Sequence, residues 1–221
     1  MSTGHHIQVR RTARYYTLGE PGSDTRDVWF VCHGYGQLAA DFIKELEVIA
    51  DSTRVIVAPE ALSRYYVASE AGFHSSESKV VASWMTREDR EAEIDDYVAY
   101  LDAVYDEVIS KVDRKDASVT VLGFSQGGAT ANRWLTRGRS RADRLIMWGA
   151  LIATDADLNQ AATFFRDVKL TIVHGTRDQF ANEKMIEDYQ RVLTEKRIPF
   201  ELVTFNGGHR MDRETLRSLA R

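Results

Sequence analysis

The chain has 221 residues, of which 43% are hydrophobic and 28% are charged, and its formal net charge is −4. A chain of this length and apolar content is able to bury one substantial core, and its charged fraction is typical of globular proteins, which argues against intrinsic disorder. No basic patch stands out, which argues against nucleic acid as the main partner.

Cysteine usage and the first residues indicate where the protein works. Cys32 is the only cysteine, so no disulfide can form within the chain, which favours a reducing compartment. We expect this thiol to pack in the core. The N-terminus lacks the apolar segment of a signal peptide, and the longest apolar stretch, residues 145–153, is too short to span a bilayer. We therefore expect a soluble cytoplasmic protein without a transmembrane segment.

Predicted strands and helices alternate along the chain. Residues 7–18 predict an exposed edge hairpin or strand, and apolar or β-branched runs predict further strands at 28–32, 54–58, 117–122, 144–150, 169–173 and 199–205. Helical spacing predicts helices at 38–50, 129–135, 155–165 and 182–193, a short C-terminal helix, and the longest helix after a capping box at 86–89. Residues 60–85 are irregular and serine-rich and predict a long loop. The alternation predicts an α/β fold with a mostly parallel sheet.

Residues 123–128 read Gly-Phe-Ser-Gln-Gly-Gly, between a predicted strand and a predicted helix. The G-x-S-x-G pattern with Ser125 at its apex is typical of a nucleophile elbow. Ser125 has to adopt a positive φ, and Gly123 and Gly127 lie where strand and helix approach too closely for a side chain. A glycine-rich turn without chemistry is the alternative, whereas a phosphate-binding loop would need a Gly-Lys-Ser/Thr ending that this stretch lacks.

Polar residues able to complete a catalytic triad follow two later strands. The chain order Ser125, Asp178, His209 is that of an α/β-hydrolase triad, and the carboxyl ends of parallel strands meet at one edge of the sheet. His209 would take the proton of Ser125 as general base, and Asp178 would fix the imidazole tautomer. Asp155 and Asp157 are rival acids, but they come one strand too early.

An oxyanion hole for this reaction needs two backbone N–H donors. We expect them from Gln126, directly after the nucleophile, and from Tyr35 in the His-Gly-Tyr-Gly stretch 33–36. His33 and His174 each precede a glycine at a strand end, and we expect both to brace loops by hydrogen bonding.

Trp84 is the one residue that we predict to line the acyl pocket, with an aromatic core contact as the alternative. The chain contains no HExxH and no paired CxxC, so we expect no metal site.

These motifs resemble the α/β-hydrolase superfamily and, within it, the phospholipase/carboxylesterase family, which includes bacterial carboxylesterases and acyl-protein thioesterases. The matching stretches span nearly the whole chain and are residues 33–36, 83–84, 123–128, 174–178 and 208–209. The resemblance implies an α/β-hydrolase fold with helices on both faces of the sheet, and a serine hydrolase of carboxylic or thio-esters that needs no cofactor. Gln37 departs from the family, which often has Asp there, and so does Trp148, where Ser is common.

The spacing of the elements bears on domain organisation and substrate size. The short interval between the strands at 144–150 and 169–173 leaves no room for an inserted cap domain, and we expect residues 1–221 to form one domain. The polar stretch 60–85 offers little apolar wall for a long chain, so we expect a small-molecule substrate with a short to medium acyl group.

The leaving group and the oligomeric state do not follow from the sequence. Acyl transfer or peptide cleavage by the same triad is the alternative reaction. A non-catalytic binding protein on a hydrolase scaffold is the third reading, which a missing triad residue would favour, and none is missing.

Overall fold

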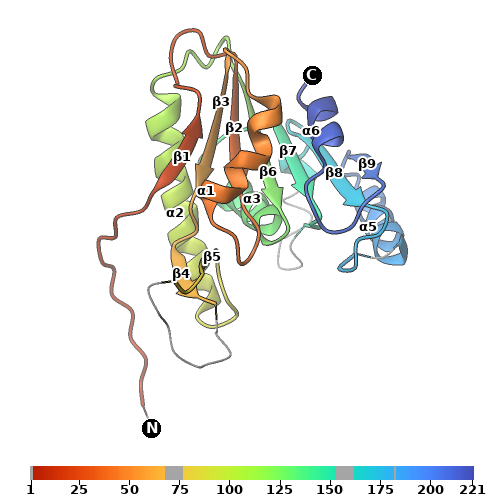
Figure 1. The fold of residues 1–221 in the computed structure, drawn as a ribbon. Helices are drawn as coiled ribbons and strands as arrows, with labels where there is room; N and C mark the ends of the chain where they lie inside the picture. The colour runs from red at the N-terminus through yellow and green to blue at the C-terminus, as the bar shows by residue number, and fades with distance from the viewer. Residues whose placement is uncertain (1, 68–76, 153–161, 182) are drawn as a thin grey trace.

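The computed structural model describes residues 2–67, 77–152, 162–181 and 183–221, and within these residues seven strands form one sheet. Its strands are β1 (Tyr15–Leu18), β2 (Asp27–Cys32), β3 (Arg54–Pro59), β6 (Ser118–Phe124), β7 (Arg144–Trp148), β8 (Lys169–Gly175) and β9 (Glu201–Phe205). Their order is β1-β3-β2-β6-β7-β8-β9, and every neighbouring pair is parallel except β1 and β3 (Figure 1). The predicted mostly parallel sheet is confirmed, and the carboxyl ends of its six parallel strands share one edge.

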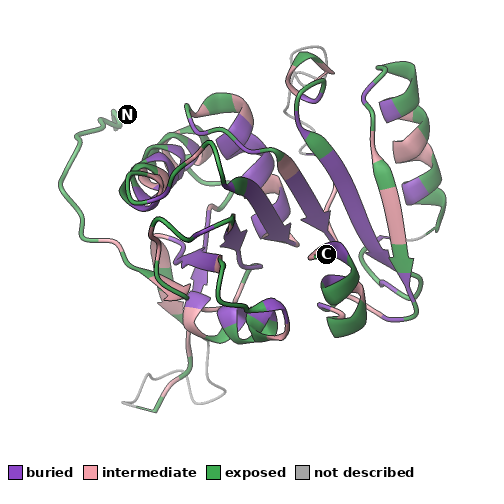
Figure 2. Ribbon diagram, turned by 90° about the horizontal axis from the view of Figure 1, so that it is seen from above, coloured by how far each residue is buried: buried purple, intermediate pink, exposed green. Residues whose placement is uncertain are grey.

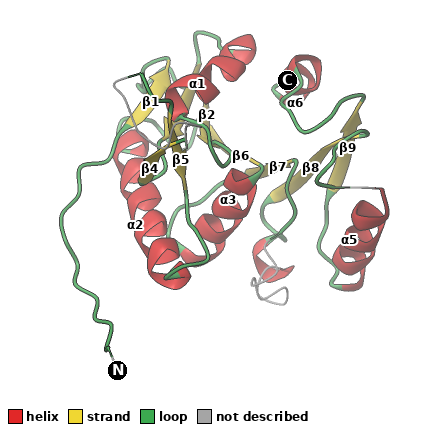
Figure 3. Cartoon of the chain, turned by 60° about the horizontal axis from the view of Figure 1, so that its bottom comes forward, coloured by secondary structure: helices red, strands yellow, loops and turns green. Residues whose placement is uncertain are grey.

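Helices cover both faces of this sheet (Figure 3). They are α1 (Ala39–Phe42), the 3₁₀ helix η1 (Ile43–Ile49), α2 (Arg90–Ile109), α3 (Gln126–Arg137), α5 (Glu183–Glu195) and α6 (Arg213–Leu219). Side chains of α2, α3 and α5 share one buried cluster with one face of the sheet, and those of α1, η1 and α6 share a second cluster with the other face.

The strands owe their place in the centre to nearly continuous apolar runs. A strand of a parallel sheet is buried on both faces. β2 is apolar at every position after Asp27, and β8 is buried at every position after Lys169 although it includes Thr171 and His174. Along β8, Leu170 and Ile172 join the cluster under α5, whereas Val173 joins the cluster under α6. Seen from above, the central strands are buried, whereas the edge strand β9 and the outer faces of the helices are largely intermediate or exposed (Figure 2).

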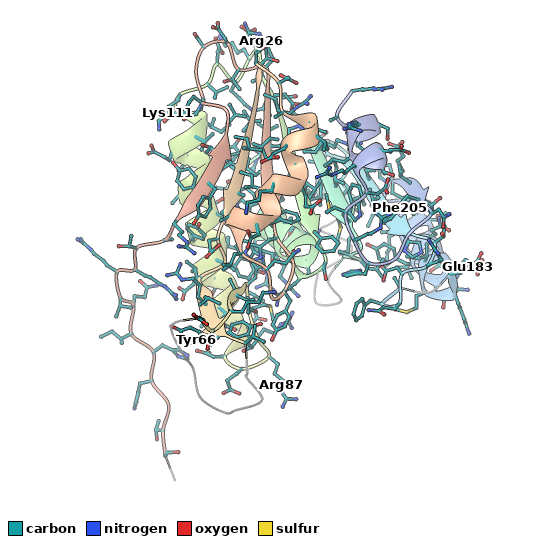
Figure 4. The ribbon with its side chains drawn as sticks, in the orientation of Figure 1. Arg26, Tyr66, Arg87, Lys111, Glu183 and Phe205 are labelled. Atoms are coloured by element: carbon teal, nitrogen blue, oxygen red, sulfur yellow. The ribbon has the colours of Figure 1, made fainter. Side chains whose placement is uncertain are left out.

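The stretch 60–85, predicted as one long loop, contains a second, two-stranded sheet. Its strands are β4 (Ser63–Tyr66) and β5 (Val80–Ser83), which pair antiparallel. This hairpin lies beyond the carboxyl ends of β2 and β3, where Figure 4 labels Tyr66, and Arg26 lies at the opposite end of the molecule. The loop prediction is wrong because each strand has only four residues and little alternation of apolar and polar side chains. The pairing depends instead on contacts with distant residues, such as those of the Gln126 side chain with the segment after β5.

Two helix starts and the N-terminal strand differ from the prediction. The longest helix begins at Arg90 after Asp89, which has a left-handed conformation and no side-chain cap, so the capping box at 86–89 is wrong. Residues 38–50 form a short α-helix that continues as a 3₁₀ helix. Of residues 7–18, only β1 is a strand. The predicted helix 155–165 lies largely outside the described residues, as does Asn182.

None of the helices in the described part of the chain is long and apolar enough to cross a bilayer.

Candidate active site

Ser125 lies at the sharp turn between β6 and α3, with φ 53° and ψ −119°. The glycines around it are required by close backbone approach, because a Cβ on Gly123 would lie 2.2 Å from the carbonyl oxygen of Gly127. A Cβ on Gly127 would lie 2.1 Å from the carbonyl oxygen of Cys32. The Ser125 N–H donates to the Trp148 carbonyl oxygen at 2.9 Å, which ties the turn to β7. The geometry expected of a nucleophile elbow is therefore present.

Asp178 and His209 form a close pair at the same edge of the sheet. His209 Nδ1 lies 2.7 Å from Asp178 Oδ2, and the carboxylate side chain is only 1% exposed. The other carboxylate oxygen, Oδ1, accepts the Phe180 N–H at 2.8 Å, so Asp178 is held at both oxygens. Because a carboxylate only accepts, Nδ1 is the nitrogen that carries the proton, and Nε2 is left as the basic nitrogen.

His209 lies next to the elbow, between two phenylalanine rings. Its ring centroid is 4.9 Å from that of Phe124, the residue before Ser125, and 4.8 Å from that of Phe180. Gly149 lies against the same ring, since a Cβ there would be 2.9 Å from His209 Cε1. Among the residues that the structure describes, no hydrogen bond joins the Ser125 hydroxyl to His209, a contact that in many hydrolases tightens only with substrate.

The loop at residues 33–37, after β2, leaves one of its N–H groups unused. Gly34 N–H donates to Gln37 Oε1 at 2.7 Å, Gly36 N–H donates to Ala82 O at 2.9 Å, and Gln37 N–H donates to Gly34 O at 3.3 Å. In the described part of the chain, the Tyr35 N–H has no such partner. It is thus available as the oxyanion donor that the sequence suggests. The side chain of Gln37, which the sequence marked only as a departure from the family, helps to set this arrangement.

Gln126 begins α3, and the first N–H groups of a helix have no partner within it, so its backbone donor is also available. Its side chain is engaged elsewhere. Gln126 Oε1 accepts the Trp84 N–H at 3.1 Å, and Nε2 donates to the Met85 carbonyl oxygen at 2.8 Å. The side chain therefore fixes the segment after β5 against the elbow.

Trp84 does not lie where the pocket prediction placed it. The residue is 1% exposed, and its indole Nε1–H donates to the His33 carbonyl oxygen at 2.8 Å. Its ring packs 5.1 Å from that of His33 and 6.2 Å from that of Tyr97. Trp84 is thus part of the core beneath the 33–37 loop, which was the alternative reading, and its role is support of that loop.

His33 braces the same loop, as expected. Its Nε2 accepts the Ala61 N–H at 3.1 Å, so its Nδ1 carries the proton and donates to the Gly34 carbonyl oxygen at 2.8 Å. Burial lowers the pKa of His33, because a charged imidazole would be poorly solvated there. The buried Glu60 carboxylate accepts the Ala39 N–H at 2.7 Å and holds the end of the loop. A neutral His33 therefore keeps both of its hydrogen bonds.

His174 does not brace a loop in this way. It is 7% exposed, and neither ring nitrogen makes a hydrogen bond within the described residues, with Nδ1 fully buried. The expectation that it acts like His33 is therefore wrong.

Two hollows flank His209. One has a volume of about 340 Å³ and is lined by Gln37, Glu45, Phe124, His209, Arg210 and Met211. The other has a volume of about 120 Å³, and its walls include Gly149, His174 and Phe180. Phe124 lines the first hollow and Phe180 the second, so the two rings that hold His209 also bound the space on either side of it.

The remaining sequence candidates are Cys32, Asp155 and Asp157. Cys32 is fully buried, and burial raises the pKa of its thiol, which fits a core role. Asp155 and Asp157 lie outside the described residues. Within the described ranges, no three side chains of the metal-ligating types cluster closely enough to hold a metal ion.

Comparison with known proteins agrees with this fold. The family model described as Phospholipase/Carboxylesterase matches residues 15–221. No curated protein matches the chain.

Solved structures that resemble the chain share its fold at low identity. Acyl-protein thioesterase 2 from Zea mays is 18% identical with a TM-score of 0.68, and the match covers 95% of this chain and 96% of that one. Esterase PE8 is 19% identical with a TM-score of 0.67, with 95% and 97% covered. A carboxylesterase from Mesorhizobium loti is 16% identical with a TM-score of 0.67, with 94% and 93% covered. The chain therefore belongs to the phospholipase/carboxylesterase family and has the α/β-hydrolase fold.

Proposed function

We propose that the protein hydrolyses carboxylic esters or thioesters through an acyl-enzyme formed on Ser125. The observation that carries this proposal is the 2.7 Å contact between His209 Nδ1 and Asp178 Oδ2, next to a strained elbow with Ser125 at its apex. The two N–H groups of Tyr35 and Gln126 would serve as oxyanion donors.

The reaction has two halves. The Ser125 hydroxyl gives its proton to His209 Nε2 while its oxygen bonds to the carbonyl carbon, and the negative oxygen of the tetrahedral intermediate accepts the Tyr35 and Gln126 N–H groups. The carbon–oxygen or carbon–sulfur bond then breaks, and His209 gives the proton to the leaving group. Water attacks the acyl-enzyme, its proton passes to Nε2 and on to Ser125, and the acid is released. Asp178 holds the Nδ1–H tautomer throughout.

Short to medium acyl groups fit this proposal best. Neither hollow beside His209 is a long apolar channel, because the larger one has Gln37, Glu45 and Arg210 in its walls and the smaller one has a volume of only about 120 Å³. A methylene group that stays exposed to solvent contributes far less to the binding free energy than the roughly 0.8 kcal/mol of a buried methylene group. The kcat/KM should therefore stop rising beyond medium chains.

A series of p-nitrophenyl esters from acetate to palmitate tests both parts of the proposal. We expect the highest kcat/KM at a short or medium ester, without a jump in rate above the critical micelle concentration. Ser125→Ala should lower kcat by at least about 10³-fold. Ser118→Ala, at the exposed start of the same strand, is the matched control and should leave kcat unchanged. A maximum at palmitate with activation by micelles would contradict the acyl-length part, and full activity in Ser125→Ala would contradict the mechanism.

A further inference from the structure

His174 is a buried polar side chain for which the triad has no use. It is 7% exposed, lies in β8, and neither ring nitrogen has a hydrogen-bond partner in the ranges that the structure describes. Buried polar atoms are almost always paired, because a buried donor or acceptor without a partner is destabilising. A buried imidazole that lacks a protein partner and lines a cavity points to a partner that arrives with a ligand.

His174 lines two cavities, a larger one of about 320 Å³ against α5 and a smaller one of about 120 Å³ that lies directly beside the predicted triad. On β8, His174 has the same orientation as Ile172, toward the face covered by α5, whose first residue, Glu183, is labelled in Figure 4. Gly149 and Phe180 line the smaller cavity, and both also contact the ring of His209. Gly149 and Phe180 therefore lie between this cavity and His209, the histidine that would act as the base for Ser125.

The two hollows around His209 differ in the way that an acyl site and a leaving-group site should differ. The larger one is bordered by the exposed side chains of Glu45 and Arg210, so a leaving group there can depart into solvent. The smaller one has the buried residues Ile172, Val173 and His174 in its walls, and the exposed ring of Phe180 also lines it. The acyl group stays on the enzyme through both halves of the reaction, and a cavity with these buried walls suits it.

The size of the smaller cavity limits what can enter. A cavity of about 150 Å³ takes a benzene ring, so one of about 120 Å³ takes about five non-hydrogen atoms. A 4-oxopentanoyl group has five such atoms beyond its ester carbonyl, and one of them is an oxygen. The 4-methylpentanoyl group has the same number and connectivity of non-hydrogen atoms, with a methyl group in place of that oxygen.

We propose that this cavity is the acyl subsite and that His174 selects acyl groups that carry a hydroxyl or keto oxygen near their far end. The inference rests on the proposed function and names the substrate class within it. The imidazole donates to, or accepts from, the oxygen of the acyl group and so gains the partner that the described residues do not supply. An acyl group with only carbon at that position leaves the ring unpaired and is bound less well in the transition state.

The test compares p-nitrophenyl 4-oxopentanoate with p-nitrophenyl 4-methylpentanoate in the full-length enzyme. The quantity measured is the ratio of their kcat/KM values, each divided by the rate constant for hydroxide-catalysed hydrolysis to remove intrinsic reactivity. We expect the wild type to favour the oxo ester. His174→Leu should lower the ratio about 3- to 10-fold, which corresponds to the loss of one neutral hydrogen bond.

Two controls are needed. One separates the effect of cavity polarity from that of cavity volume, and the other separates recognition of the acyl group from recognition of the leaving group. Ile172→Val changes the apolar wall of the same cavity and should alter both esters alike, so its ratio should stay within about twofold of the wild type. When the acyl group is held constant and phenyl replaces p-nitrophenyl, His174→Leu should leave the leaving-group ratio unchanged.

Each other outcome overturns the inference. A ratio that His174→Leu does not change, or a change in the leaving-group ratio instead, rules out an acyl subsite at His174. If His174→Leu does not fold, the wild type alone decides, because a preference for the methyl ester contradicts the proposal. Failure of the proposed function is a different result, namely no Ser125-dependent turnover of either ester.

Discussion

The indole N–H of Trp84 donates to the main-chain carbonyl oxygen of His33 over 2.8 Å, and so connects the buried core to the loop that carries the Tyr35 N–H. His33 is bonded in turn at both ring nitrogens, to Gly34 and Ala61. The position of a prospective oxyanion donor therefore depends on an aromatic side chain that substrate does not contact.

Trp84→Phe removes this donor and keeps most of the ring. We expect a loss of about 1–3 kcal/mol in the free energy of unfolding, because the buried His33 carbonyl oxygen loses its partner. We also expect kcat to fall several-fold with little change in KM, since the loop acts mainly on the transition state. Urea denaturation and steady-state kinetics measure the two effects.

Trp29→Phe is the matched control, because the Trp29 indole donates to Asp27 Oδ2 at 2.7 Å at the other end of β2. This variant should lose stability and keep its kcat. An equal loss of kcat in both variants would show that Trp84 acts through general stability alone.

Asp178→Asn should lower kcat by about 10³- to 10⁴-fold. The carboxylate accepts the Nδ1–H of His209, whereas an amide N–H at the same place would favour the opposite tautomer and leave Nε2 protonated. Kinetics on a p-nitrophenyl ester measure the loss, and Asp157→Asn is the control. If Asp157→Asn abolished activity and Asp178→Asn did not, the assignment of the acid would be wrong.

The free energy of unfolding should fall as the pH drops below about 6.5, in part through His33. Burial lowers the pKa of His33 from its ordinary value of 6.5, so the unfolded chain binds a proton that the folded chain does not. Stability from this group is complete above pH 6.5 and is lost toward the lower folded pKa, by at most about 1.4 kcal/mol per pH unit. Denaturation of wild type and His33→Gln at several pH values isolates this contribution. Parallel pH profiles for the two proteins would contradict it.

Cys32 should react with thiol reagents only as the chain unfolds. The residue is fully buried in β2 and burial raises the pKa of its thiol, so little thiolate exists at neutral pH. The expected result is a rate of reaction with a disulfide reagent that follows the unfolding rate and rises steeply in urea. Rapid labelling of the native enzyme with loss of activity would show instead that Cys32 is accessible.

The sequence was sufficient for the fold and for the relative placement of the predicted triad. Apolar runs recur at strand spacing between helical patterns, and the edge of a parallel sheet brings the residues after its strands together. Asp178 and His209 follow β8 and β9, so chain order alone predicted their contact. The need for the glycines around Ser125 could also be predicted from the sequence, because it comes from close backbone contacts within the turn that the motif defines.

What the sequence did not predict depends on packing between distant segments. Trp84 is buried because Gln126 holds the segment after β5, and no local pattern predicts that contact. Gln37 bonds to a backbone N–H rather than to a side chain, so residue type gave no sign of its role. His33 and His174 both stand in a His-Gly pair after apolar residues, yet among the described residues only His33 has hydrogen-bond partners for its ring nitrogens.

The measurement that tests the central claim most directly is covalent labelling by a fluorophosphonate, followed by peptide mass spectrometry. The probe reacts with a serine only where a base takes its proton and donors stabilise the new oxyanion, so it reports on the whole arrangement at once. We predict one adduct per chain, on the peptide that contains Ser125, with parallel loss of esterase activity and no adduct in Ser125→Ala. An adduct at another serine, or an unlabelled protein that still hydrolyses esters, would contradict the account.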